Sequence, residues 1–154
     1  MIEFWQDWQL WLATQPVEWA VLIAAFVSAT LLPGGTEVIL VAGILAIHDP
    51  WRWVWLVTLA SVGNTAGAMV SFFMGRSLPE GKAAKLQRAR RWCQRYGAPA
   101  LLLSWLPVVG DALPLAAGWL GMDWRRAFVY IALGKTARFV VVALIALNAR
   151  GMLT

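Results

Sequence analysis

The chain has 154 residues, of which 60% are hydrophobic and only 14% are charged. Soluble domains contain about 45–50% apolar and about 25% charged residues, so this composition excludes an ordinary soluble domain and indicates an all-α integral membrane protein. The net charge of +5 comes from basic residues that flank apolar segments. This placement favours a role in membrane orientation over nucleic-acid binding.

The first segment, residues 1–16, has an amphipathic pattern that ends at Pro16. Its apolar residues recur at helical spacing: Phe4, Trp5, Trp8, Trp11 and Leu12. This pattern predicts a helix that lies in the membrane interface. The segment contains no Lys or Arg, so we expect no cleavable signal peptide.

The first half of the chain, residues 17–75, combines a broken apolar stretch with an unbroken one. Residues 17–47 are interrupted at 33-PGG-35, and the flanking pieces are shorter than the roughly 20 residues that a spanning helix needs. We therefore expect two half-helices in a re-entrant hairpin, with one long kinked helix as the alternative. Residues 51–75 are long enough to span the membrane and begin with interfacial tryptophans.

A polar and basic linker, residues 76–96, separates this half from the second half, residues 97–148. We expect the linker to form a short cytoplasmic helix. Its basic residues are Arg76, Lys82, Lys85, Arg88, Arg90, Arg91 and Arg95. Residues 97–121 are apolar and broken at Pro107 and Pro114, which predicts a second re-entrant hairpin. Residues 124–148 form a second expected span, with Lys135 and Arg138 inside it.

The two halves repeat the same order of features. Both hairpins carry Leu-Pro-x-x-x-acid, at residues 32–37 and 106–111, and both spans carry Gly-x-Thr-Ala, at residues 63–66 and 134–137. Each half then crosses the membrane once, so the repeats are inverted. The linker with Arg125 and Arg126 holds nine basic residues, against two on the other side. The positive-inside rule places the linker in the cytoplasm and both termini in the periplasm.

Glu37 and Asp111 are equivalent acids at the tips of the two hairpins. Inverted repeats with broken helices place binding sites near the membrane midplane, at the junction of the repeats. A carboxyl group that lies between apolar surroundings and a cation can gain or lose a proton as those surroundings change. Glu37 and Asp111 are therefore the candidate proton-coupling residues.

Lys135 and Arg138 are three residues apart and share one face of the second span. Arg138 lies roughly 18 Å along the helix from Arg126, deep in a hydrocarbon core roughly 30 Å thick. Its planar guanidinium suits a phosphate group, so both residues are candidate ligands of a lipid phosphate. The alternative is a structural ion pair with Glu37 or Asp111. Both interpretations hold if a substrate displaces the acid.

Other candidates surround this charged group. Gly34 and Gly35 allow a tight turn, Thr36 can cap the following half-helix, and the exposed amides there could hold a phosphate; a plain turn is the alternative. Asn64 takes the place equivalent to Lys135 and is a candidate for the substrate path. The surrounding Gly63-x-x-x-Gly67 is more typical of close helix packing.

The chain resembles the DedA superfamily of membrane proteins (SNARE-associated or VTT-type), and most closely its short YqaA-type branch. The resemblance covers about residues 17–148. The motifs that carry it are 28-SATLLPGGTEVILVA-42, 63-GNTAG-67, 96-YGAPALLLSWLPVVGDALPLAAGW-119 and 134-GKTARF-139. It implies two re-entrant hairpins that face each other from opposite leaflets of a bacterial inner membrane. It also implies translocation of undecaprenyl phosphate or phospholipids, dependent on the proton-motive force.

The second hairpin departs from the family pattern. Typical members have an arginine three residues before and three residues after its proline, whereas this chain has Ser104 and Gly110 there. We expect that the cation has moved to the span, to Lys135 and Arg138. Ser104 remains a candidate substrate-binding residue at that position.

Three functions are compatible with these features. The first is a proton-coupled transporter or flippase of an anionic lipid, and a homo-oligomer is compatible with it. The second is a proton-coupled exporter of small cations that uses Glu37, a class that usually needs four full spans. The third is a non-transporting scaffold, which would leave the buried Lys135 and Arg138 unexplained. The sequence contains no Ser-His-acid set, metal cluster or phosphate-loop motif, so we expect neither an enzyme nor a cofactor.

Overall fold

The computed structural model describes residues 16–30, 36–46, 51–78, 86–106 and 109–153. Every regular element in these ranges is helical, which confirms the all-α class for the described part of the chain. In chain order the elements are α2 (Val17–Thr30), α3 (Thr36–Ala46), α4 (Arg52–Gly75), α5 (Gln87–Tyr96), the 3-10 helix η2 (Ala98–Trp105), α6 (Val109–Trp119) and α7 (Trp124–Leu153). The expected interfacial helix lies outside the described residues, apart from Pro16.

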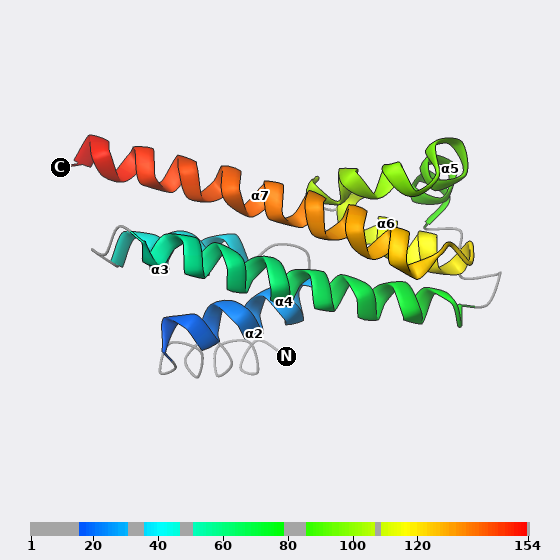
Figure 1. Ribbon diagram of the computed structural model, residues 1–154, viewed down its shortest axis with the longest axis horizontal. Coiled ribbons are helices and arrows are strands. Elements are labelled where there is room, and N and C mark those ends of the chain that lie inside the picture. The colour runs from blue at the N-terminus through cyan, green and yellow to red at the C-terminus, as the bar shows by residue number, and fades with distance from the viewer. Residues whose placement is uncertain (1–15, 31–35, 47–50, 79–85, 107–108, 154) are drawn as a thin grey trace.

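Two helices are long and apolar enough to cross a membrane, α4 over 24 residues and α7 over the 28 residues Trp124–Gly151. At about 1.5 Å per residue both exceed a core about 30 Å thick. They pack against each other and run in opposite directions (Figure 1). Most of the apolar part of α4 is buried, whereas less than a third of that of α7 is buried. Helices long enough to span thus occupy both expected segments, although α7 continues beyond residue 148.

Helices α2 and α3 form an antiparallel hairpin. Thr36, at the start of α3, contacts Ser28 and Ala24 near the end of α2, while Gly43 lies against Val17 at its start. The two chain directions therefore oppose each other, and the single kinked helix considered above is excluded. The break itself, residues 31–35, lies outside the described residues.

The second hairpin consists of η2 and α6, and it corrects one expectation. Pro114 does not break the second half of the hairpin, because α6 continues through it. Proline removes one backbone hydrogen bond, here to the carbonyl of Gly110. The ring of Pro114 is fully buried, and neighbouring helices make prolines tolerable inside membrane helices. Pro107 lies outside the described residues.

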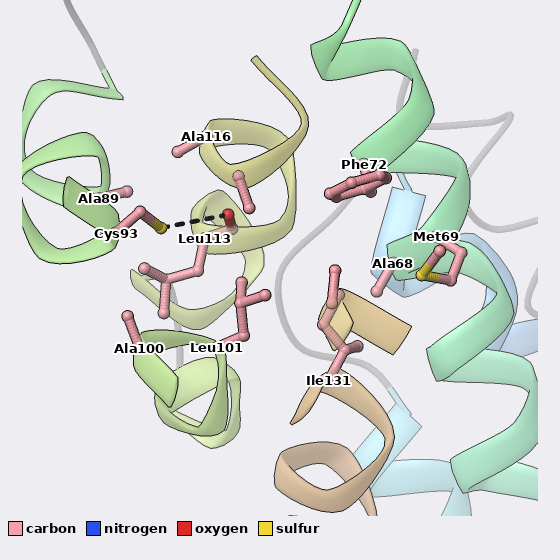
Figure 2. Packing of buried hydrophobic residues seen from close by; sticks show 12 residues of the cluster. Ala68, Met69, Phe72, Ala89, Cys93, Ala100, Leu101, Leu113, Ala116 and Ile131 are labelled. Atoms are coloured by element: carbon pink, nitrogen blue, oxygen red, sulfur yellow. Dashed lines mark hydrogen bonds between the residues drawn. The ribbon is translucent and has the colours of Figure 1, made fainter. Parts of the chain in front are cut away.

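Among the described residues, the interior contains two large apolar clusters that share α4 and α7, beside a small one around Ala20 and Ala24. One joins the second half of α4 to α5, η2, α6 and the first part of α7 (Figure 2). The other joins α2 and α3 to the first half of α4 and the later part of α7. Between the clusters lies a set of buried and half-buried polar residues that we call the polar layer. Its members are Thr36, Glu37, Ser61, Asn64, Thr65, Ser104, Asp111, Lys135 and Arg138.

Glycines allow the hairpin helices to approach the spans closely. A Cβ atom at Gly63 would lie 2.5 Å from the carbonyl oxygen of Leu22, and one at Gly67 would lie 2.5 Å from that of Phe26. These distances are too short for any side chain, so the Gly63-x-x-x-Gly67 motif serves helix packing, as predicted. Gly134, the counterpart of Gly63 in the second half, approaches the carbonyl oxygen of Leu102 in η2 in the same way.

The linker helix α5 packs against α6 through a small apolar face. Ala89 and Cys93 are buried there, and the Cys93 thiol faces the carbonyl oxygen of Leu113 at 4.0 Å (Figure 2). Burial raises the pKa of this thiol to about 11. On the same side, the Arg90 guanidinium stacks over the Trp119 ring at 4.5 Å. The linker is therefore docked onto the second hairpin.

Candidate functional site

The polar layer contains two ion pairs, both of which connect α7 to a hairpin. The Nζ atom of Lys135 donates to Oδ1 of Asp111 at 2.5 Å. The Arg138 guanidinium pairs with the carboxylate of Glu37. Lys135 also interacts electrostatically with Arg138 and Glu37. The structure thus brings together the four charged residues that the sequence singled out.

The local sequence explains how these charges meet. Lys135 and Arg138 are three residues apart, so they project from one face of α7. Glu37 lies in the first turn of α3 and Asp111 in the first turn of α6. A carboxylate is favourable at a helix N-terminus because it faces the positive end of the helix dipole. Each acid is therefore stabilised both by its own helix and by a cation on α7.

The two pairs differ in exposure. The Lys135 side chain has no exposed surface and that of Asp111 is 21% exposed. The Arg138 side chain is 13% exposed and that of Glu37 is 25% exposed. Arg138 is therefore the more accessible of the two cations, whereas Lys135 is enclosed by protein. Arg138 presents a planar group of donors that binds a carboxylate or a phosphate with equal geometric fit.

Thr36 has a different role from the one predicted. It is the first residue of α3, but its hydroxyl lies 2.8 Å from that of Ser28 and donates to the carbonyl oxygen of Ala24 at 3.4 Å. It therefore ties the two helices of the first hairpin together instead of capping α3. Gly34 and Gly35 lie outside the described residues, so their predicted contribution stays a prediction.

Asn64 and Ser104 are both buried and both keep an unused polar atom. The Nδ2 atom of Asn64 donates to the carbonyl oxygen of Ala25 at 3.0 Å, which joins α4 to α2 and not to either ion pair. Ser104 lies against α7, because a Cβ atom at Gly134 would be 2.7 Å from its Oγ atom. In the part of the chain that the structure describes, Asn64 Oδ1 and Ser104 Oγ have no hydrogen-bond partner. Ser104 thus lies beside the residue that precedes Lys135.

One ion pair was not anticipated. Arg52, at the start of α4, pairs with Glu18 at the start of α2. Arg52 is one of the two basic residues that the charge count assigns to the side opposite the linker. Glu18 falls on that side as well, and this was the only sequence signal for the pair. Arg52 is half-exposed, and exposed pairs contribute only about 0–1 kcal/mol to stability.

Among the described residues, no group of three His, Cys, Asp or Glu side chains could hold a metal ion.

Comparison with known proteins extends these observations. The family model of the VTT domain matches residues 32–147, a range that contains both ion pairs of the polar layer. The inner membrane protein YqaA of Escherichia coli is 46% identical over 132 residues, which cover 84% of this chain and 89% of the relative. An uncharacterized protein of Haemophilus influenzae is 41% identical over 128 residues, covering 77% of this chain and 80% of the relative.

No solved structure matches the chain. The family model covers more than half of the sequence, and the Escherichia coli relative matches along nearly its whole length. The four charged residues on α3, α6 and α7 lie within the matched region. The chain therefore belongs to the VTT-domain family, the DedA family of membrane proteins.

Proposed function

We propose that this protein transports an anionic lipid across the bacterial inner membrane and couples this transport to protons. The substrate class is a polyprenyl phosphate, such as undecaprenyl phosphate, or a phospholipid. Two observations support the membrane location: the Escherichia coli relative YqaA is named an inner membrane protein, and α4 and α7 are long enough to span.

The pair of Arg138 with Glu37 is the observation that carries the proposal. Ionisable groups are costly inside a membrane protein and usually serve transport. Arg138 is partly exposed, and its partner Glu37 is a carboxylate, which resembles a phosphate in charge and geometry. A lipid phosphate would replace Glu37 on the guanidinium, and the displaced Glu37 would then take up a proton. Release of the phosphate would restore the ion pair and return the proton.

The packing of the two halves supports a mechanism that alternates between the two membrane faces. The equivalent helices α4 and α7 run in opposite directions (Figure 1). Gly63 and Gly134 each pack against the first helix of their own hairpin. In addition, α3 contacts α7 and α6 contacts α4, so each hairpin reaches across to the other half. We propose that the hairpins are re-entrant, come from opposite faces, and admit the lipid in turn.

The substitution Arg138→Lys tests this site. Lysine keeps the charge that pairs with Glu37 but lacks the fork that binds a phosphate through two donors. We expect the variant to fold. Its rate of lipid transport should fall by about tenfold or more, because it loses one charge-assisted hydrogen bond to the phosphate. The measurement is movement of a labelled polyprenyl phosphate or phospholipid in liposomes with an imposed pH difference.

The matched control is Arg126→Lys, an exposed arginine at the start of the same helix, which should transport at the wild-type rate. Wild-type transport by Arg138→Lys would contradict the phosphate-binding role and leave Arg138 as an ion-pair partner. If the unmodified protein moves a small cation and no lipid, the exporter considered above replaces the lipid transporter.

A further inference from the structure

The linker helix α5 has a second face that the packing of the hairpins does not use. Ala89 and Cys93 occupy the buried face, and Arg90 is directed onto Trp119. The remaining basic residues, Arg88, Arg91 and Arg95, are exposed. The sequence of α5 contains no acidic residue, so its own helix does not neutralise these charges.

These exposed arginines lie along a shallow, open hollow of about 530 Å³, whose lining includes Arg88, Arg91, Trp92 and Arg95. The lining residues follow the spacing i, i+3, i+4 and i+7, which places them on one face of the helix. Like charges at this spacing repel each other. An anion between them would remove that repulsion, because guanidinium groups bind phosphate oxygens through two parallel hydrogen bonds.

The position of α5 in the molecule indicates the source of the anion. The helix lies at the end of the molecule where α4 ends and α7 begins, opposite the C-terminus (Figure 1). Trp124, Arg125 and Arg126 are exposed at the start of α7, as is typical of a span that leaves the hydrocarbon core. The hollow therefore lies near the headgroup layer. By the positive-inside rule this is the cytoplasmic leaflet, which is rich in anionic lipids.

We propose that the hollow on α5 binds the phosphate-bearing headgroup of an anionic phospholipid of the cytoplasmic leaflet. The three arginines contact the phosphate. Trp92 is half-buried and packs against the apolar cluster of the second hairpin, and its remaining surface lines the hollow, where an indole ring favours the interface between headgroups and acyl chains. Because α5 is docked on α6 through Cys93 and Arg90, the bound lipid holds the second hairpin at the membrane surface. This site is separate from Arg138 and does not rest on the transport proposal.

The test measures lipid retained by the full-length protein in mild detergent. Purified protein is mixed with equal amounts of phosphatidylglycerol and phosphatidylcholine, and the bound lipids are counted by native mass spectrometry. Each arginine that contacts the headgroup contributes about 1 kcal/mol, which is about fivefold in binding, so Arg91→Gln with Arg95→Gln should lower phosphatidylglycerol binding about 25-fold. The matched control, Arg125→Gln with Arg126→Gln, removes the same charge at the same end of the molecule and should retain the lipid.

Three outcomes would overturn the proposal. If the control variant loses as much phosphatidylglycerol binding, any basic residue at this end of the molecule would suffice to bind the lipid. If the wild type retains phosphatidylcholine as well as phosphatidylglycerol, the site does not distinguish lipids by headgroup charge. Displacement of phosphatidylglycerol by inorganic phosphate alone would assign the hollow to a soluble anion. Should the glutamine variant fail to insert, Arg91→Lys with Arg95→Lys preserves the charge and must still weaken binding, because lysine lacks the fork.

Discussion

Asp111 and Glu37 both lie in the first turn of their helices but have different surroundings. Lys135, the partner of Asp111, is fully enclosed, whereas Arg138, the partner of Glu37, reaches the surface. Removing one member of a buried pair leaves an uncompensated charge. The effect of removing each acid therefore depends on its cation. Loss of Asp111 should affect mainly folding, and loss of Glu37 mainly activity.

We expect Asp111→Asn to destabilise the protein by about 3 kcal/mol, the lower end for breaking a buried pair. Glu37→Gln should lower the free energy of unfolding clearly less. It should abolish the pH dependence of transport, because glutamine cannot take up a proton. Unfolding curves in detergent and transport at several pH values measure the two effects.

A second substitution distinguishes this explanation from a general effect on packing. Lys135→Met in the Asp111→Asn background removes the unpaired charge and should restore most of the lost stability. Equal destabilisation by Glu37→Gln and Asp111→Asn would contradict the assigned difference between the pairs.

At the scale of the helices, glycine contacts hold the hairpins to the spans. Gly67→Ala would place a methyl group against the carbonyl oxygen of Phe26, and overpacking of this kind costs about 1–3 kcal/mol. The thermal midpoint should fall by several degrees. Gly151→Ala is the control, because a Cβ atom there meets nothing within 4 Å. An unchanged midpoint for Gly67→Ala would show that α2 and α4 can separate without cost.

The positions of most helices follow from local signals in the sequence. The proline and glycines at 33–35 fall between the end of α2 at Thr30 and the start of α3 at Thr36. Pro114 was misread because a buried ring and neighbouring helices outweigh the local tendency of proline to end a helix.

The partners of the charged residues depend on how the hairpins dock, and the sequence left them open. Lys135 could have paired with either acid, since both hairpin tips were expected near the midplane. Along the chain, Lys135 is 24 residues from Asp111 and 98 residues from Glu37. Neither separation fixes a contact, so spacing alone does not show which acid pairs with Lys135. The stacking of Arg90 on Trp119 likewise depends on the docking of α5 on α6.

Equivalent positions in the two halves make similar packing contacts but carry different charges. Gly63 and Gly134 make equivalent contacts, yet both cations lie on α7, whereas α4 carries Asn64 and Gly67 at the corresponding positions. The second span therefore neutralises the acids of both hairpins. If the two halves arose by duplication, as the sequence repeat predicts, their charged centre is asymmetric.

At the scale of the whole molecule, the orientation of the chain follows from its uneven distribution of basic residues. We expect α5 in the cytoplasm and the C-terminus in the periplasm. In a Cys93→Ala background, a cysteine at exposed Gln94 should react only with reagents that enter the cytoplasm, and one at exposed Gly151 should react from outside. Labelling of both positions from the same side would contradict the inverted arrangement of the two halves.

The polar layer contains two carboxylates and two cations, so its net charge is zero when all four groups are ionised. If a singly charged lipid phosphate replaces Glu37 on Arg138 and Glu37 gains one proton, the sum remains zero. Moving one elementary charge through a membrane potential of 100 mV is worth about 2.3 kcal/mol, but this exchange would move none. The proposed transport would then respond to a difference in pH and remain indifferent to membrane voltage, which a potassium–valinomycin clamp on the same liposomes would measure.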